Sequence, residues 1–168
     1  MDLAKYDWDK EIKLKQQSKE YFKEDELMSI LCQITSSLNF LQIKNISHRD
    51  IKPQNVLVFD KMIYKLADFG EAKEIVRRKR NQTDTLRGTE LYMSPILFYA
   101  LQNNQFDIKH NVYKSDVYSL GLSMVYAASL MYNPIYDLRN CNNAQTVIVI
   151  LNKYFNKRYS DKFISLLA

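Results

Sequence analysis

Residues 48–55 read His-Arg-Asp-Ile-Lys-Pro-Gln-Asn, and this stretch decides how the rest of the chain is interpreted. Asp50 and Lys52 are two residues apart, so an extended backbone points both side chains to one face. A carboxylate that accepts a hydroxyl proton would then lie beside an ammonium that neutralises phosphate charge. Pro53 excludes a helix interior here. Asn55 supplies an oxygen of the kind that Mg²⁺ prefers, so the stretch is typical of phosphate chemistry.

The segment after Asn55 predicts a β-hairpin. Residues 56–59 and 63–67 are two short apolar runs, and the turn residues 60–62 separate them. A hairpin returns the chain to its starting point, so it would bring Asp68 close to Asn55. A carboxylate would then face an amide across a space fit for a metal ion. Gly70, two residues later, gives the backbone freedom at this point.

These two stretches resemble the catalytic core of eukaryotic-type serine/threonine protein kinases. Residues 48–55 match the catalytic-loop pattern H-R-D-x-K-P-x-N, and residues 68–70 match D-F-G. Each motif alone is more often an ordinary turn or loop, but both occur here in order with a hairpin between them. Lysine two residues after the aspartate is the serine/threonine form of the loop.

The resemblance assigns a role to each residue of the two motifs. Asp50 would be the catalytic base, and Lys52 would contact the transferred phosphate. Asn55 and Asp68 would hold Mg²⁺ and, with Lys52, bind ATP. The other implied contacts are Leu57 under the adenine ring and Phe69 packed beside His48.

Two later stretches extend the resemblance. Residues 88–95 resemble G-T-x-x-Y-M-A-P, in which Thr89 would hydrogen-bond near the catalytic base and lysine. The family pattern continues with glutamate, whereas this chain has Ile96, which puts the usual ion-pair anchor of this segment in doubt. Residues 115–121 match the D-V-[WY]-S-x-G start of the central kinase helix. There, Asp116 would hold the backbone of the catalytic turn, and Ser115 or Asp116 would also suit the N-cap.

Residues 68–95 would form the activation segment. Thr83 and Thr85 lie in its polar middle and are candidate phosphorylation sites. Arg49 could pair with a phosphate on either residue and so order the segment. The alternative is that both threonines simply belong to a polar loop.

Apolar periodicity predicts helices on both sides of the catalytic loop. They cover residues 8–17, 24–44 and 144–154, and another begins near residue 161. Residues 117–136 carry no charge, but they include serine, asparagine and proline. A helix buried in a domain explains them better than a membrane span. Asn133 and Pro134 would end this central helix.

The composition favours a globular domain over a disordered chain. The 168 residues are 46% hydrophobic and 26% charged, which is typical of a globular domain. The net charge is +5, yet the basic run at residues 77–80 is more often a solvated loop than a nucleic-acid site. Cys32 and Cys141 have no metal-binding spacing. We therefore expect no nucleic-acid partner; the cytoplasm is the default location, and the nucleus stays open.

The resemblance implies a mainly α fold with a small β-hairpin, that of the C-terminal lobe of a protein kinase. Residues 1–168 would be a partial kinase domain: hinge, catalytic loop, activation segment and central helix. The N-lobe would be lacking, because no glycine precedes Gly70 and Met1 falls at the hinge. The end of the C-lobe would also be lacking, because the helix that begins near residue 161 is cut short. The expected activity is transfer of the γ-phosphate of ATP to a protein hydroxyl. The alternatives are a non-catalytic kinase-like binding module, if the chain is complete, and a small-molecule phosphotransferase.

Overall fold

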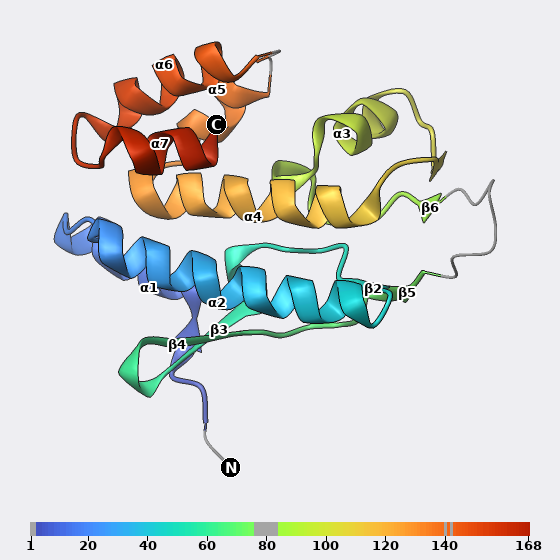
Figure 1. Cartoon of the computed structure of the whole chain (residues 1–168), viewed down its shortest axis with the longest axis horizontal. Helices are drawn as coiled ribbons and strands as arrows, with labels where there is room; N and C mark the ends of the chain where they lie inside the picture. The colour runs from blue at the N-terminus through green and yellow to red at the C-terminus, as the bar shows by residue number, and fades with distance from the viewer. Residues whose placement is uncertain (1–2, 76–83, 140, 142) are drawn as a thin grey trace.

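The computed structural model describes residues 3–75, 84–139, 141 and 143–168. Its elements form layers around one long buried helix, α4 (Val112–Ser129) (Figure 1). Helix α2 (Glu24–Ile43) packs against α4 on one side, and a small sheet lies beyond α2. Helices α5 (Asn133–Leu138), α6 (Ala144–Phe155) and α7 (Asp161–Leu167) lie on the other side of α4. The mainly α class predicted from the sequence is confirmed.

Helices α1 (Trp8–Ser18) and α2 confirm the two predicted N-terminal helices to within a residue. Asp7 caps α1, since its carboxylate accepts a hydrogen bond of 2.8 Å from the Lys10 amide. Acidic residues occupy the first turn of both helices, where the helix dipole favours them. The predicted apolar face of α2 is its buried face: Leu27, Ile30, Ile34, Leu38 and Leu41.

The predicted hairpin is also present. Strand β3 (Val56–Phe59) pairs with β4 (Ile63–Leu66), and the 3₁₀-helix η2 (Asp60–Met62) forms the turn between them. Side-chain burial alternates along β3, as expected for a strand with one face on the core: Val56 and Val58 are buried, while Leu57 and Phe59 are only partly buried. Strand β1 (Tyr6–Asp7), which the sequence did not predict, pairs antiparallel with β3 and completes a sheet of order β1-β3-β4.

Both predicted ends of the central helix were wrong. Helix α4 begins three residues before Ser115, and Asn111 is its N-cap, with its side chain accepting from the Lys114 amide at 3.1 Å. The helix stops at Ser129, followed by Leu130 in a left-handed conformation at φ 58°. Pro134 lies in the first turn of α5, where a missing N–H costs nothing. Asp116 is thus inside the helix and available for another role.

The capping assignment leads to a stability prediction. Replacing Asn111 with alanine should lower the free energy of unfolding by about 1 kcal/mol, because the Lys114 amide loses its acceptor. Urea denaturation of the two proteins measures the difference. Asn39→Ala is the matched control: Asn39 is exposed within α2, so this variant should keep or slightly raise stability. Equal stability of Asn111→Ala and the wild type would contradict the assignment.

Short elements that the sequence did not predict complete the described fold. Strand β2 (Ile46–Ser47) pairs with β5 (Lys73–Glu74), and β6 (Asp84–Thr85) pairs with β7 (Asp107–Ile108). Helix α3 (Pro95–Gln102) follows the segment at residues 88–94.

Helices α6 and α7 confirm the predicted C-terminal helices. Among the described residues no helix is long and apolar enough to cross a membrane. Residues 117–129 belong to a buried helix, as predicted, although Val117 itself is exposed.

Candidate active site

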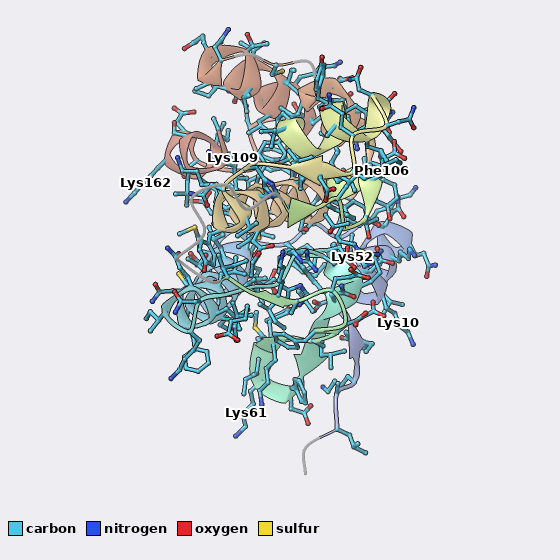
Figure 2. All side chains as sticks on the ribbon, turned by 90° about the vertical axis from the view of Figure 1, so that its right-hand side faces the viewer. Lys10, Lys52, Lys61, Phe106, Lys109 and Lys162 are labelled. Carbon is cyan, nitrogen blue, oxygen red and sulfur yellow. The ribbon has the colours of Figure 1, made fainter. Side chains whose placement is uncertain are left out.

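The carboxylate of Asp50 is the centre of a dense hydrogen-bond network. Its Oδ1 accepts from the backbone N–H of Thr89 at 2.9 Å and from the Thr89 hydroxyl at 2.8 Å. Its Oδ2 lies 2.7 Å from the Lys52 ammonium and accepts a 3.0 Å hydrogen bond from the side-chain nitrogen of Asn55. The predicted pairing of Asp50 with Lys52 on one face is therefore present. Figure 2 places Lys52 at mid-height in the molecule, well above Lys61 of the hairpin turn.

Thr89 joins the catalytic loop to the segment at residues 88–95. Besides its two bonds to Asp50, its hydroxyl accepts a 2.8 Å hydrogen bond from the Lys52 ammonium. This close approach requires the preceding glycine, because Gly88 has φ 106° and a Cβ there would lie 2.7 Å from the Arg49 carbonyl oxygen. The structure therefore contains the contacts of Thr89 with Asp50 and Lys52 that the sequence implied only by resemblance.

Asp116 holds the turn that carries the catalytic loop. From inside α4, its carboxylate accepts hydrogen bonds from the His48 amide at 2.9 Å, the Arg49 amide at 2.8 Å and the Ser47 hydroxyl at 2.8 Å. Burial raises the pKa of Asp116, although these three donors act in the opposite direction. Arg49 has φ 67°, a left-handed conformation that these bonds stabilise. The backbone bonds that the resemblance implied for Asp116 are therefore present, whereas its partner Ser47 had no signal in the sequence.

His48 links the catalytic loop to the D-F-G motif. Its ring lies 5.0 Å from the ring of Phe69, centroid to centroid, as the resemblance implied. Its Nε2 lies 3.0 Å from the Ala67 carbonyl oxygen, which can only accept, so Nε2 carries the proton. His48 is fully buried, whereas Phe69 is 48% exposed.

The two proposed metal ligands are neighbours along the hairpin. The Ala67 amide donates to the Asn55 carbonyl at 2.9 Å, so Asp68 directly follows a residue bonded to Asn55. The Asn55 side-chain nitrogen donates to the Asp50 backbone oxygen at 2.8 Å, which leaves the amide oxygen as the atom able to hold a cation. Asp68 is exposed. No hydrogen bond joins these two side chains in the described part of the chain, and their oxygens fit Mg²⁺ by type.

Gly70 has a different part from the one predicted. The left-handed conformation in this motif falls on Asp68, at φ 58°, and not on the glycine. A Cβ at Gly70 would lie 3.2 Å from the Asp68 Oδ1, tighter than most real contacts. Gly70 therefore leaves room for the Asp68 carboxylate.

Leu57 lies in the middle strand of the sheet, opposite Asp7 of β1 and Lys65 of β4. It is partly buried. The side of the hairpin that carries Leu57 is opposite the side on which Val56 and Val58 enter the core. Contact of Leu57 with adenine stays a prediction.

Arg49 points toward the start of the activation segment. Its Nε donates to the Glu71 carbonyl oxygen at 2.6 Å, and the Glu71 carboxylate lies 3.5 Å from the Arg87 Nε. Thr83 and the basic run 77–80 lie outside the described residues. Thr85 is exposed on β6. Its phosphorylation, and the pairing of a phosphate with Arg49, stay predictions.

The segment at residues 88–95 is anchored by contacts that sequence reasoning missed. Ile96, which replaces the family's glutamate, is 46% exposed and holds no buried ion pair. The Ser119 hydroxyl donates to the Tyr92 carbonyl at 2.7 Å, and the hydroxyls of Ser94 and Ser115 lie 2.9 Å apart. Arg139 donates to the Glu90 carbonyl at 2.7 Å. Serines are too common, and Arg139 too distant in sequence, to be recognised from one sequence.

The surroundings of Asp50 predict how stability depends on pH. Burial alone would raise the pKa of Asp50, but the bonds from Lys52, Thr89 and Asn55 together outweigh it and lower that pKa. A lowered carboxyl pKa stabilises the folded state above the unfolded value of about 3.9, and this contribution is lost as the pH falls through the folded value.

The wild type should therefore be more stable than Asp50→Asn at pH 6. Its advantage in the free energy of unfolding should shrink as the pH falls from 6 to 3. Urea denaturation of both proteins at several pH values measures it, since the asparagine variant lacks the titrating group. A difference that stays constant or grows over this range would contradict the lowered pKa.

Comparisons with known proteins agree with this geometry. The model of the protein kinase domain matches residues 5–168. The chain is 39% identical over 104 residues to the serine/threonine-protein kinase nekl-2 of Caenorhabditis elegans, covering 61% of this chain and 26% of that protein. It is 36% identical over 120 residues to the serine/threonine-protein kinase Nek4 of Mus musculus, covering 71% and 14%. It is 33% identical over 138 residues to the serine/threonine-protein kinase atg1 of Dictyostelium discoideum, covering 80% and 18%.

The alignments therefore span about a quarter or less of these relatives. Nevertheless, the domain match covers nearly all of this chain, and the structure supplies the linked contacts of Asp50, Lys52, Thr89 and Asp116. The chain belongs to the protein kinase family.

Proposed function

We propose that this chain is the catalytic lobe of a serine/threonine protein kinase, which transfers the γ-phosphate of ATP to a hydroxyl of a protein substrate. The observation that carries the proposal is the Asp50 carboxylate, fixed by four donors from Thr89, Lys52 and Asn55. Structural carboxylates are often fixed in this way too. Here, however, the Asp50 carboxylate lies 2.7 Å from the Lys52 ammonium, and both residues are only partly buried, so a substrate can reach both groups.

The chemistry follows from the arrangement of charges. Asp50 would orient the substrate hydroxyl and accept its proton. Lys52 would neutralise negative charge on the transferred phosphoryl group. Thr89 holds these two side chains in register, which matters because phosphoryl transfer depends chiefly on positioning.

Asn55 and Asp68 would hold Mg²⁺, which neutralises charge on the β- and γ-phosphates when it is bound. Leu57 would support the adenine ring of ATP from the middle strand of the sheet. Glu90 follows Thr89 directly and is exposed, so a peptide substrate would lie over this part of the described surface.

Phosphate transfer by the full-length protein tests the proposal. Incubation with ATP labelled on the γ-phosphate, Mg²⁺ and a generic acceptor such as casein should label phosphoserine and phosphothreonine. The label should disappear with Asp50→Asn and with EDTA. No transfer to any acceptor would favour a non-catalytic binding module. Labelled small molecules with unlabelled protein would favour a small-molecule phosphotransferase.

A further inference from the structure

One arginine side chain joins three separate parts of the substrate side of the lobe. Arg139 directly follows α5, and its Nη2 donates to the Glu90 carbonyl at 2.7 Å. Glu90 begins the 3₁₀-helix η3 (Glu90–Tyr92). The same guanidinium lies 3.8 Å from the centre of the Phe98 ring in α3. Both a charge-assisted hydrogen bond and a cation–π contact therefore hold η3 against α3 and α5.

The carbonyl that Arg139 binds is one residue from the group that fixes the catalytic carboxylate. Thr89 immediately precedes Glu90, and its amide and hydroxyl both donate to Asp50. Its own carbonyl accepts from the Tyr92 amide at 2.9 Å, so Thr89 and the η3 turn move together. A shift of Glu90 would therefore shift the Thr89 hydroxyl away from Asp50 and Lys52.

We propose that Arg139 is a positioning residue for phosphoryl transfer: by holding the Glu90 carbonyl it keeps Thr89 bonded to Asp50 and Lys52. The inference rests on the proposed kinase activity. It assigns to this chain an anchor made of an arginine and a backbone carbonyl. Since the acceptor is a carbonyl, the anchor does not depend on the side chain at position 90.

The chain contains a matched control for this side chain. Arg158 also stacks on an aromatic ring, 3.7 Å from the centre of Tyr21, and its Nη2 also donates to a carbonyl, that of Tyr154, at 2.6 Å. Both arginines are partly buried. The Arg158 contacts, however, join α6 to the loop after α1, and neither partner adjoins Thr89. The two arginines thus have the same chemistry in different places.

Methionine substitution separates the two roles. Arg139→Met keeps an unbranched side chain against Phe98 but loses the hydrogen bond, and Arg158→Met does the same at Tyr21. In the full-length kinase, Arg139→Met should lower kcat about 10- to 100-fold, as misplacement of a catalytic group does. The KM for ATP should change less than about twofold, because Arg139 is not among the residues assigned to ATP. Arg158→Met should keep kcat within about twofold even if both variants lose similar stability.

Arg139→Lys provides the conservative rescue. A lysine can donate to the Glu90 carbonyl but cannot stack a planar group on Phe98, so kcat should lie between the wild type and Arg139→Met. If Arg139→Met does not fold, Arg139→Lys against Arg158→Lys makes the same comparison. Equal kcat in the Arg139 and Arg158 variants, whether both reduced or both unchanged, would overturn the proposal.

A second readout does not need activity. The Thr89 amide donates to Asp50, so its hydrogen exchange reports whether the segment is in place. Exchange at Thr89 should be several-fold faster in Arg139→Met and unchanged in Arg158→Met. Faster exchange in a protein that transfers no phosphate would sink the kinase proposal while supporting the anchor. Unchanged exchange and unchanged kcat in an active kinase would sink the anchor alone.

Discussion

Asp50→Asn should lower the kcat of phosphate transfer by about 10² to 10⁴, the range expected when a general base is lost. Asparagine preserves the shape of the side chain but has no negative charge and cannot take the proton of the substrate hydroxyl. It also supplies only one acceptor oxygen. Because Thr89 donates to Oδ1 while Lys52 and Asn55 donate to Oδ2, one side of the network would face an NH₂ group instead.

Steady-state assays of the full-length protein at saturating ATP measure this loss. Asp60→Asn is the control with the same chemical change. Asp60 lies in the hairpin turn with its side chain 80% exposed, and its ion pair with Lys5 is on the surface, so activity should stay within about twofold. More than a tenth of wild-type kcat in Asp50→Asn would exclude Asp50 as the base.

Asp116→Ala should lower the free energy of unfolding by about 3 kcal/mol. The substitution leaves the Ser47 hydroxyl and the amides of His48 and Arg49 without their acceptor, and unsatisfied buried donors cost about 1–3 kcal/mol each. Removal of the buried carboxylate offsets part of this loss, because burial disfavours the charge. Arg49 would also lose the bonds that stabilise its left-handed conformation, so activity should fall as well.

Urea denaturation of this chain measures the change in stability. Asp25→Ala is the control, since Asp25 is exposed in the first turn of α2 and contributes less than about 1 kcal/mol through the helix dipole. Should Asp116→Ala cost no more than Asp25→Ala, the three hydrogen bonds would not stabilise the fold as described.

The sequence alone predicted most of the contacts around Asp50, for a physical reason. Asp50, Lys52 and Asn55 lie within one short loop, so their spacing fixes which face each side chain shares. The β3–β4 hairpin is likewise local, with a turn of three residues. Helices α1, α2 and α6 follow from apolar periodicity because each is at least 11 residues long.

The parts that the sequence did not predict depend on partners far along the chain. Strand β1 is two residues long and exists because Tyr6 pairs with Val58 of the hairpin. Two residues carry no periodicity by which a strand could be recognised. The cap of α4 was misassigned because Ser115 suits an N-cap by type, yet its hydroxyl meets Ser94 instead.

Pro134 shows why an isolated proline is ambiguous. Proline is excluded from a helix interior but welcome in the first turn, so it can follow one helix or begin the next. Here α4 had already stopped at Ser129, and Pro134 begins α5. Arg139 was missed for a related reason, since its role depends on where α5 ends relative to Glu90.

The bonds from Asp116 to the catalytic turn determine how this lobe loses its active geometry on heating. Because the His48 and Arg49 amides are hydrogen-bonded to a residue within the buried helix α4, we expect them to open mainly in the global unfolding of the fold. Asp68 and Phe69 are exposed and lack such a tie, so they can open by local fluctuation. Thermal loss of structure should therefore begin reversibly at the D-F-G motif, whereas the Asp50 side of the site is expected to fail only in the cooperative unfolding of the whole fold.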